Sequence, residues 1–106
     1  DQRAATRAQR LAARIEKGLT TDGSPLRVPI NNPRRIGTYE TFQTERAATN
    51  WVVGTLADAA AYGWDTDSYT EAIDQVITAI ANKHGRTISD VKEDIDRRVT
   101  AAVRRR

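Results

Sequence analysis

The sequence predicts an all-α fold: a small bundle of about four helices, with an extended proline-containing arm after the first helix. Apolar residues recur at helical spacing in four segments, and a glycine follows three of these segments. Three prolines interrupt residues 18–37 and exclude a helix there. No pair of strands is evident. The length of 106 residues suits one compact domain.

Residues 1–17 are expected to form a basic amphipathic helix. Its apolar stripe is mostly alanine, with Leu11 and Ile15 as the larger members. Five cations, spaced four, three, four and three residues apart, share one stripe beside it. Because alanine buries little area, this helix should pack weakly and need a partner for its stability. The basic stripe comprises Arg3, Arg7, Arg10, Arg14 and Lys17.

Residues 18–37 are expected to be an extended arm or linker. Pro25, Pro29 and Pro33 bias the residues before them to extended backbone. The apolar residues at positions 26, 28 and 30 alternate with Arg27 and Pro29, so a short extended piece could lie on the domain with its apolar side inward. A connection this long is usually functional or mobile. Arg34 and Arg35 add positive charge to it.

Residues 38–106 are expected to form the helical core and a basic C-terminal tail. The second helix should start between positions 38 and 41 and end at Gly63, and the fourth should begin near positions 87–89. The third should open at Ser68, in a capping box of the form S-x-x-E, and end at Gly85. Trp51 and Trp64 are expected to supply bulk to the core. A strip of small residues predicts a helix-packing interface at Gly54, Ala57 and Ala61.

Charge is distributed unevenly along the chain. The net charge is +3, and the basic residues are mostly arginine, a bias that a GC-rich genome also produces. Both ends are basic, whereas the middle, residues 38–86, is acidic. This asymmetry fits a polyanion bound by the ends, or attraction between the ends and the middle of the same or a neighbouring chain.

Several classes of site lack the residues that they require. The chain has no cysteine and one histidine, His84, and it has neither a glycine-rich phosphate loop nor a nucleophile elbow. Residues 65–71 alternate oxygen ligands, but Thr70 and Val76 stand at the sixth and twelfth positions, where a calcium loop requires glycine and glutamate. We therefore expect no enzyme, no catalytic residue, no cofactor and no metal.

The junction between the third and fourth helices has the spacing of a DNA-reading motif. Ala81, Gly85 and Val91 fall at intervals that resemble a helix-turn-helix core. The first turns of the fourth helix, however, carry Asp90, Glu93 and Asp94, which phosphates repel. Groove reading by this helix is therefore disfavoured, and the acids are explained by the helix dipole.

The expected function is a non-enzymatic helical interaction or assembly module, a subunit or adaptor whose basic ends engage an acidic partner. The alternative is sequence-nonspecific binding of DNA or RNA by the same residues. We expect a homo-oligomer or a protein partner, a cytoplasmic location and no membrane contact. Because the chain opens at Asp1 without a signal-peptide pattern, it is expected to be a trimmed piece. The C-terminal members of the basic set are Arg104, Arg105 and Arg106.

Overall fold

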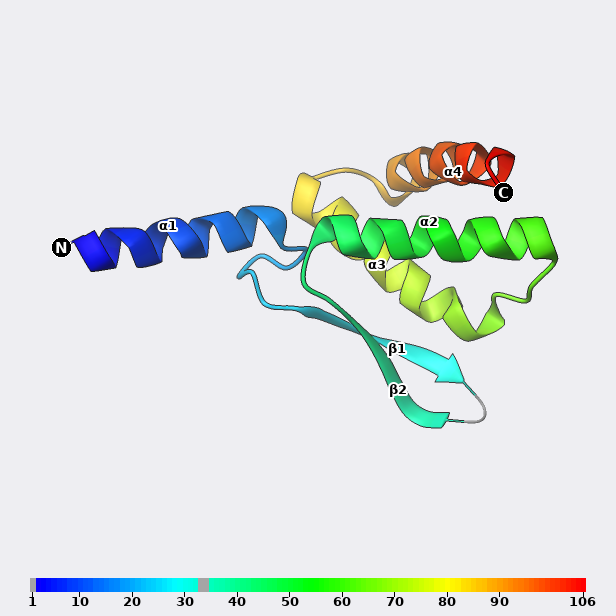
Figure 1. Ribbon diagram of the computed structural model, residues 1–106, viewed down its shortest axis with the longest axis horizontal. Coiled ribbons are helices and arrows are strands. Elements are labelled where there is room, and N and C mark those ends of the chain that lie inside the picture. The colour runs from blue at the N-terminus through cyan, green and yellow to red at the C-terminus, as the bar shows by residue number, and fades with distance from the viewer. Residues whose placement is uncertain (1, 33–34) are drawn as a thin grey trace.

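The protein is a mostly helical molecule that includes one β-hairpin, as the computed structural model shows (Figure 1). The structure describes residues 2–32 and 35–106, and the side chains of all of these except 31, 32, 35 and 36. In chain order the elements are α1 (Gln2–Lys17), β1 (Leu26–Asn32), β2 (Arg35–Phe42), α2 (Glu45–Tyr62), a 3₁₀ turn η1 (Asp67–Tyr69), α3 (Thr70–His84) and α4 (Ile88–Arg104).

The hairpin corrects the expectation of a purely helical chain. β1 and β2 pair antiparallel, with Leu26 opposite Phe42 and Val28 opposite Glu40. Each strand of a two-stranded sheet keeps a free edge, and such an edge tolerates Pro29 inside β1. The residues expected to form an arm are therefore partly a strand. The expected start of the second helix, at positions 38–41, belongs to β2 instead.

The core lies between the hairpin and three helices, with α3 in the middle. The alternating residues Val28 and Ile30 of β1 are buried, and β1 packs on α3. The other side of α3 packs on α2 and α4. This central position explains why α3 buries more residues than any other element described: Ala72, Ile73, Val76, Ile77, Ile80 and Ala81.

Local chemistry sets the helix ends. Gly63 and Gly85 follow α2 and α3 in the left-handed conformation, as predicted. Thr44 caps α2, and its hydroxyl accepts the backbone N–H of Ala47 at 3.1 Å. The predicted capping box is wrong, because Ser68 lies within η1 and α3 begins at Thr70 without a side-chain cap.

The two tryptophans have different environments. Trp51 packs against the core and contacts the rings of Phe42 and Tyr69. Trp64 lies after the end of α2 and is 61% exposed, so its expected place in the core was wrong. Gly63 turns the chain away from α2 before Trp64, which therefore does not continue the buried face of that helix.

Helix α1 projects from one end of this body (Figure 1). It has no buried residue, whereas each of the other three α-helices has at least three. The molecule is consequently elongated, with principal extents of 56 × 32 × 25 Å.

Candidate interaction surface

The exposed face of α1 is the first candidate surface. All five cations of the predicted basic stripe lie on α1 and are exposed. Leu11, on the neighbouring apolar stripe, is 45% exposed, and Ile15 is only partly covered. An amphipathic helix normally buries its apolar stripe against another element. In α1 the largest part of that stripe faces solvent.

A tight turn holds the C-terminal end of α1. Leu19 is 2% exposed and belongs to the core, which anchors the chain directly after the helix. Gly23 has a φ of 77°, and a Cβ there would lie 3.1 Å from the backbone nitrogen of Ile15. A Cβ on Gly18 would lie 2.8 Å from the carbonyl oxygen of Arg14. The two glycines therefore allow the chain to fold back closely against the last turn of α1.

Hydrogen bonds within residues 20–24 close this turn. The Asp22 carboxylate accepts the hydroxyl of Ser24 at 2.6 Å and its backbone N–H at 2.9 Å. The Thr20 hydroxyl donates to the same carboxylate at 3.1 Å. These bonds, led by that from the Ser24 hydroxyl, favour the ionised form and lower the pKa of Asp22 to about 2.

Lys83, near the end of α3, connects α1 to the body. Its ammonium group donates to the carbonyl oxygen of Glu16 at 2.7 Å and also to that of Gly18. A cation at a helix C-terminus satisfies carbonyl groups that lack partners within the helix, and it is attracted by the helix dipole. Lys83 also forms an ion pair with Glu45, the first residue of α2, at 3.3 Å. One side chain thus joins the ends of three helices.

Glu45 is also held by His84. The Nε2 atom of His84 lies 2.8 Å and 2.9 Å from the two carboxylate oxygens of Glu45. Partial burial raises the pKa of Glu45, but the hydrogen bonds from His84 and Lys83 outweigh that effect and bring the pKa below its ordinary value. The carboxylate therefore remains ionised under mildly acidic conditions.

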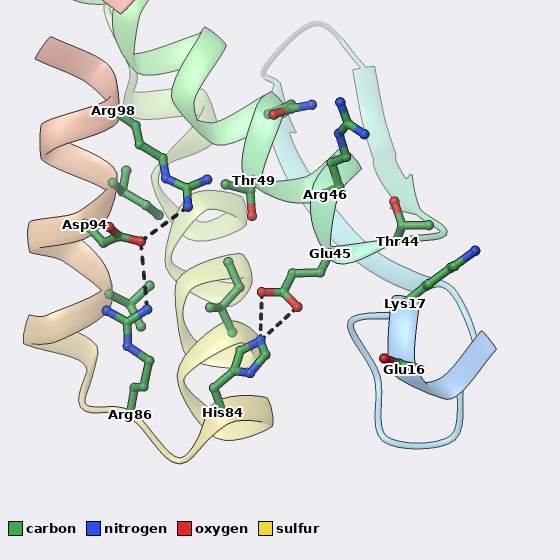
Figure 2. A pocket seen from close by; sticks show the side chains of 14 residues that line it. Glu16, Lys17, Thr44, Glu45, Arg46, Thr49, His84, Arg86, Asp94 and Arg98 are labelled. Atoms are coloured by element: carbon green, nitrogen blue, oxygen red, sulfur yellow. Dashed lines mark hydrogen bonds and ion pairs between the residues drawn. The ribbon is translucent and has the colours of Figure 1, made fainter. Parts of the chain in front are cut away.

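A groove of about 760 Å³ runs past these residues (Figure 2). Its walls come from the C-terminal end of α1, the first turns of α2, the end of α3 and the first half of α4. Buried apolar side chains, among them Ile80 and Ile95, lie between its charged groups. Within the described part of the chain, Lys17 and Arg46 line the groove without an ion-pair partner.

Asp94 anchors the cations on the α4 side of the groove (Figure 2). Arg97 donates to its carboxylate at 3.1 Å, and Arg98 and Arg86 lie 3.6 Å and 3.8 Å from it. The hydrogen bond from Arg97 and the charges of all three arginines lower the pKa of Asp94. The carboxylates at the start of α4, which disfavour its insertion into a DNA groove, are thus partly neutralised by arginines in the fold.

The predicted basic residues do not form one site. The helix that carries the basic stripe projects at one end of the molecule, whereas the C-terminus lies toward the other end (Figure 1). There Arg106 forms an ion pair with Asp58 at 2.7 Å. Arg34 and the side chain of Arg35 lie outside the described residues.

The predicted strip of small residues on α2 has mixed surroundings. Ala57 is fully buried, Gly54 is partly covered and Ala61 is exposed. A Cβ on Gly54 would meet no atom within 4 Å, so no neighbouring helix approaches closely at that point. The use of these residues as a helix-packing interface stays a prediction.

An exposed aromatic pair at the end of α2 is a second candidate surface, which the sequence interpretation missed. Tyr62 and Trp64 are 60% and 61% exposed, and their ring centroids lie 5.6 Å apart. The exposed carboxylates of Asp65, Asp67 and Glu71 follow them in the chain. Large exposed aromatic side chains are enriched where proteins meet. The signal available in the sequence was the position of Trp64 directly after a helix-ending glycine.

Other kinds of site have less support. Among the described residues, no group of histidine and carboxylate side chains is arranged to hold a metal ion. None of the helices in that part of the chain combines the length and the apolar character needed to span a membrane. No protein-family model, curated protein or solved structure matches the chain.

Proposed function

We propose that this protein is a non-enzymatic interaction module whose projecting helix α1 engages an acidic protein partner. The observation that carries the proposal is the absence of any buried residue on a strongly amphipathic 16-residue helix. A single helix of this length is marginally stable in water unless an apolar face is covered. A partner that covers this face would stabilise α1.

The attachment of α1 supports the same function. The Lys83 contacts and the turn at residues 18–24 hold the helix at its C-terminal end and leave its other turns accessible. Fixing the direction of a binding element before association reduces the entropy lost on binding. The arrangement therefore suits a preorganised helix that docks along its length.

The composition of the exposed face favours a protein over a nucleic acid. A basic stripe alone would suit phosphates equally well. Leu11 and Ile15, however, lie on an apolar stripe beside the cations, and a phosphate backbone offers no apolar surface to cover them. An acidic protein surface with apolar side chains satisfies both stripes.

The test compares two probes by fluorescence anisotropy at low salt. The first is an amphipathic peptide with leucine on one face and glutamate on the other, and the second is a random-sequence DNA duplex. We expect the peptide to bind, and the double variant Arg7→Glu/Arg14→Glu to weaken it by about tenfold or more, a change of about 1.4 kcal/mol. The matched control Lys92→Glu/Arg105→Glu changes the net charge equally and should leave peptide binding intact.

Three results would contradict the proposal: no peptide binding, equal binding by the Arg7/Arg14 variant, or binding of the duplex alone. The last would favour the nucleic-acid alternative, which also predicts a strong salt dependence and a loss of binding in the Arg105 control. Circular dichroism of each variant would verify that the fold is retained.

A further inference from the structure

We infer that the surface covering α1 belongs to a second copy of the same chain, at the exposed Tyr62–Trp64 pair and the carboxylates that follow it. This inference depends on the proposed function of α1 as a docking helix and names its partner. Four features support it: the charges of the two surfaces, their apolar groups, their separation within one molecule, and the lack of ion pairs at the carboxylates near Trp64 among the described residues.

The two surfaces have opposite charge. Residues 2–17 contain five cations and one carboxylate. Residues 47–82 contain five carboxylates and neither lysine nor arginine. Among the described residues, Asp65, Asp67, Glu71 and Asp74 form no ion pair, whereas Asp58 is paired with Arg106. The carboxylates near Trp64 therefore remain available to the basic stripe of another molecule.

The apolar groups are complementary as well. The apolar stripe of α1 is rich in alanine, so it presents a nearly flat surface apart from Leu11 and the partly covered Ile15. The rings of Tyr62 and Trp64 offer extended flat faces that are mostly uncovered. Arginine side chains flank the stripe, and guanidinium groups bind favourably over the faces of tryptophan and tyrosine. Both stripes of α1 thus find suitable groups at one location.

The same contact is impossible within one molecule. Figure 1 shows α1 extending from one end of the long axis and the connection from α2 to α3 at the opposite end. The longest extent of the molecule is 56 Å, and α1 is tied at its C-terminal end by Lys83. The complementary surfaces can meet only between copies. Because each contact joins two different surfaces, it is satisfied by an antiparallel dimer with two contacts or by a head-to-tail chain.

The experiment uses light scattering of the full chain and two double variants at low salt. The helix variant Arg7→Glu/Arg14→Glu changes α1, and the corner variant Asp67→Lys/Glu71→Lys changes the surface beside Trp64. Because Asp67 and Glu71 lie in the first turns of η1 and α3, circular dichroism must verify that the corner variant keeps its fold. We expect the wild type to exceed its monomer mass of 11.8 kDa as its concentration rises, and each variant alone to stay monomeric. An equimolar mixture of the two variants should form dimers and nothing larger, since it contains one intact pair of surfaces per two chains.

A matched control and a charge-independent variant sharpen the result. Lys92→Glu/Arg97→Glu, which reverses two exposed cations of α4 on neither proposed surface, should associate as the wild type does. Trp64→Ala, which keeps every charge, should weaken association by about tenfold. Raising the salt to about 1 M should weaken it too, because the screening length falls to about 3 Å.

The inference is overturned if the wild type stays monomeric up to millimolar concentration, if the corner variant associates as the wild type does, or if the mixture of variants stays monomeric. The outcome for the proposed function is separate. A monomeric wild type whose α1 still binds the acidic peptide would refute self-docking and leave the proposed function intact, whereas loss of both would refute both.

Discussion

The ammonium group of Lys83 lies 2.7 Å from the carbonyl oxygen of Glu16, across 67 residues of the sequence. This contact connects the last turn of α3 to the last turn of α1. Lys83 is only 15% exposed, and it also pairs with Glu45. Since α1 has no buried residue, the direction in which it projects depends on this lysine and on the turn that follows the helix.

Replacing Lys83 by methionine should loosen α1. The variant removes a charged donor from two carbonyl groups, so we expect the free energy of unfolding to fall by about 1–2 kcal/mol. Amide hydrogens of α1 should exchange faster than those of α3, which keeps its core contacts. The control is Lys92→Met, because Lys92 is exposed and unpaired among the described residues. Unchanged exchange in α1 would show that Lys83 does not hold it.

Glu45 should make stability depend on pH. Its pKa is lower in the folded protein than its ordinary value of 4.5, so its contribution is complete above that value and disappears as pH falls through the folded pKa. Glu45→Gln should therefore destabilise the protein near neutral pH, and its difference from the wild type should shrink in acid. Urea unfolding between about pH 6 and about pH 3 measures this.

The control for Glu45 is Glu40→Gln. Glu40 is exposed and has no ion pair in the described part of the chain. Its variant should follow the wild type throughout the titration. A difference between Glu45→Gln and the wild type that stays constant with pH would contradict the assignment of the effect to this carboxylate.

Replacing Gly23 by alanine should lower the free energy of unfolding more than replacing Gly63 by alanine. Both have positive φ, 77° and 70°, so alanine costs about 1 kcal/mol of backbone strain at either position. At Gly63 an added Cβ meets open space, whereas at Gly23 it lies 3.1 Å from the nitrogen of Ile15. Gly23→Ala should therefore destabilise the protein more and should also reduce the helical signal from α1. Equal losses of stability would show that the turn adapts.

The sequence predicts well those features that short segments determine. The periodicity of α1, the basic stripe from Arg3 to Lys17 and the helix-ending positions Gly63 and Gly85 follow from spacing and backbone conformation. The alternation of apolar and polar residues also predicts the inward-facing side of the extended segment, where Val28 and Ile30 are buried. Such features depend on neighbours within a few residues, so a single sequence contains them.

Features that depend on distant neighbours were missed. The sequence pattern places a helix start at positions 38–41, inside β2, although Tyr39, Thr41 and Phe42 are types that favour strands. Their pairing with β1 becomes visible only when both segments are considered together. The Lys83 contacts with α1 likewise arise from tertiary structure. So does the exposure of Trp64, because only the fold determines whether a tryptophan lies in the core or on the surface.

A comparison of Val28 and Leu11 tests whether the hairpin belongs to the core while α1 does not. Val28 is fully buried, so Val28→Ala removes two buried methyl groups and leaves a cavity, at a cost of about 2 kcal/mol. Leu11 is 45% exposed, so Leu11→Ala should change the stability of the monomer by less than about 0.5 kcal/mol. Urea unfolding of dilute protein in high salt, where association is weakest, measures both.

The same pair of variants separates folding from association. Leu11→Ala should weaken self-association in light scattering at low salt, because it removes the largest exposed group of the apolar stripe. Val28→Ala should leave association unchanged at temperatures where it remains folded, since Val28 lies in the core and on neither proposed surface. If Leu11→Ala instead destabilised the monomer as much as Val28→Ala does, α1 would be packed on its own chain, and the assignment of its apolar stripe to a partner would fail.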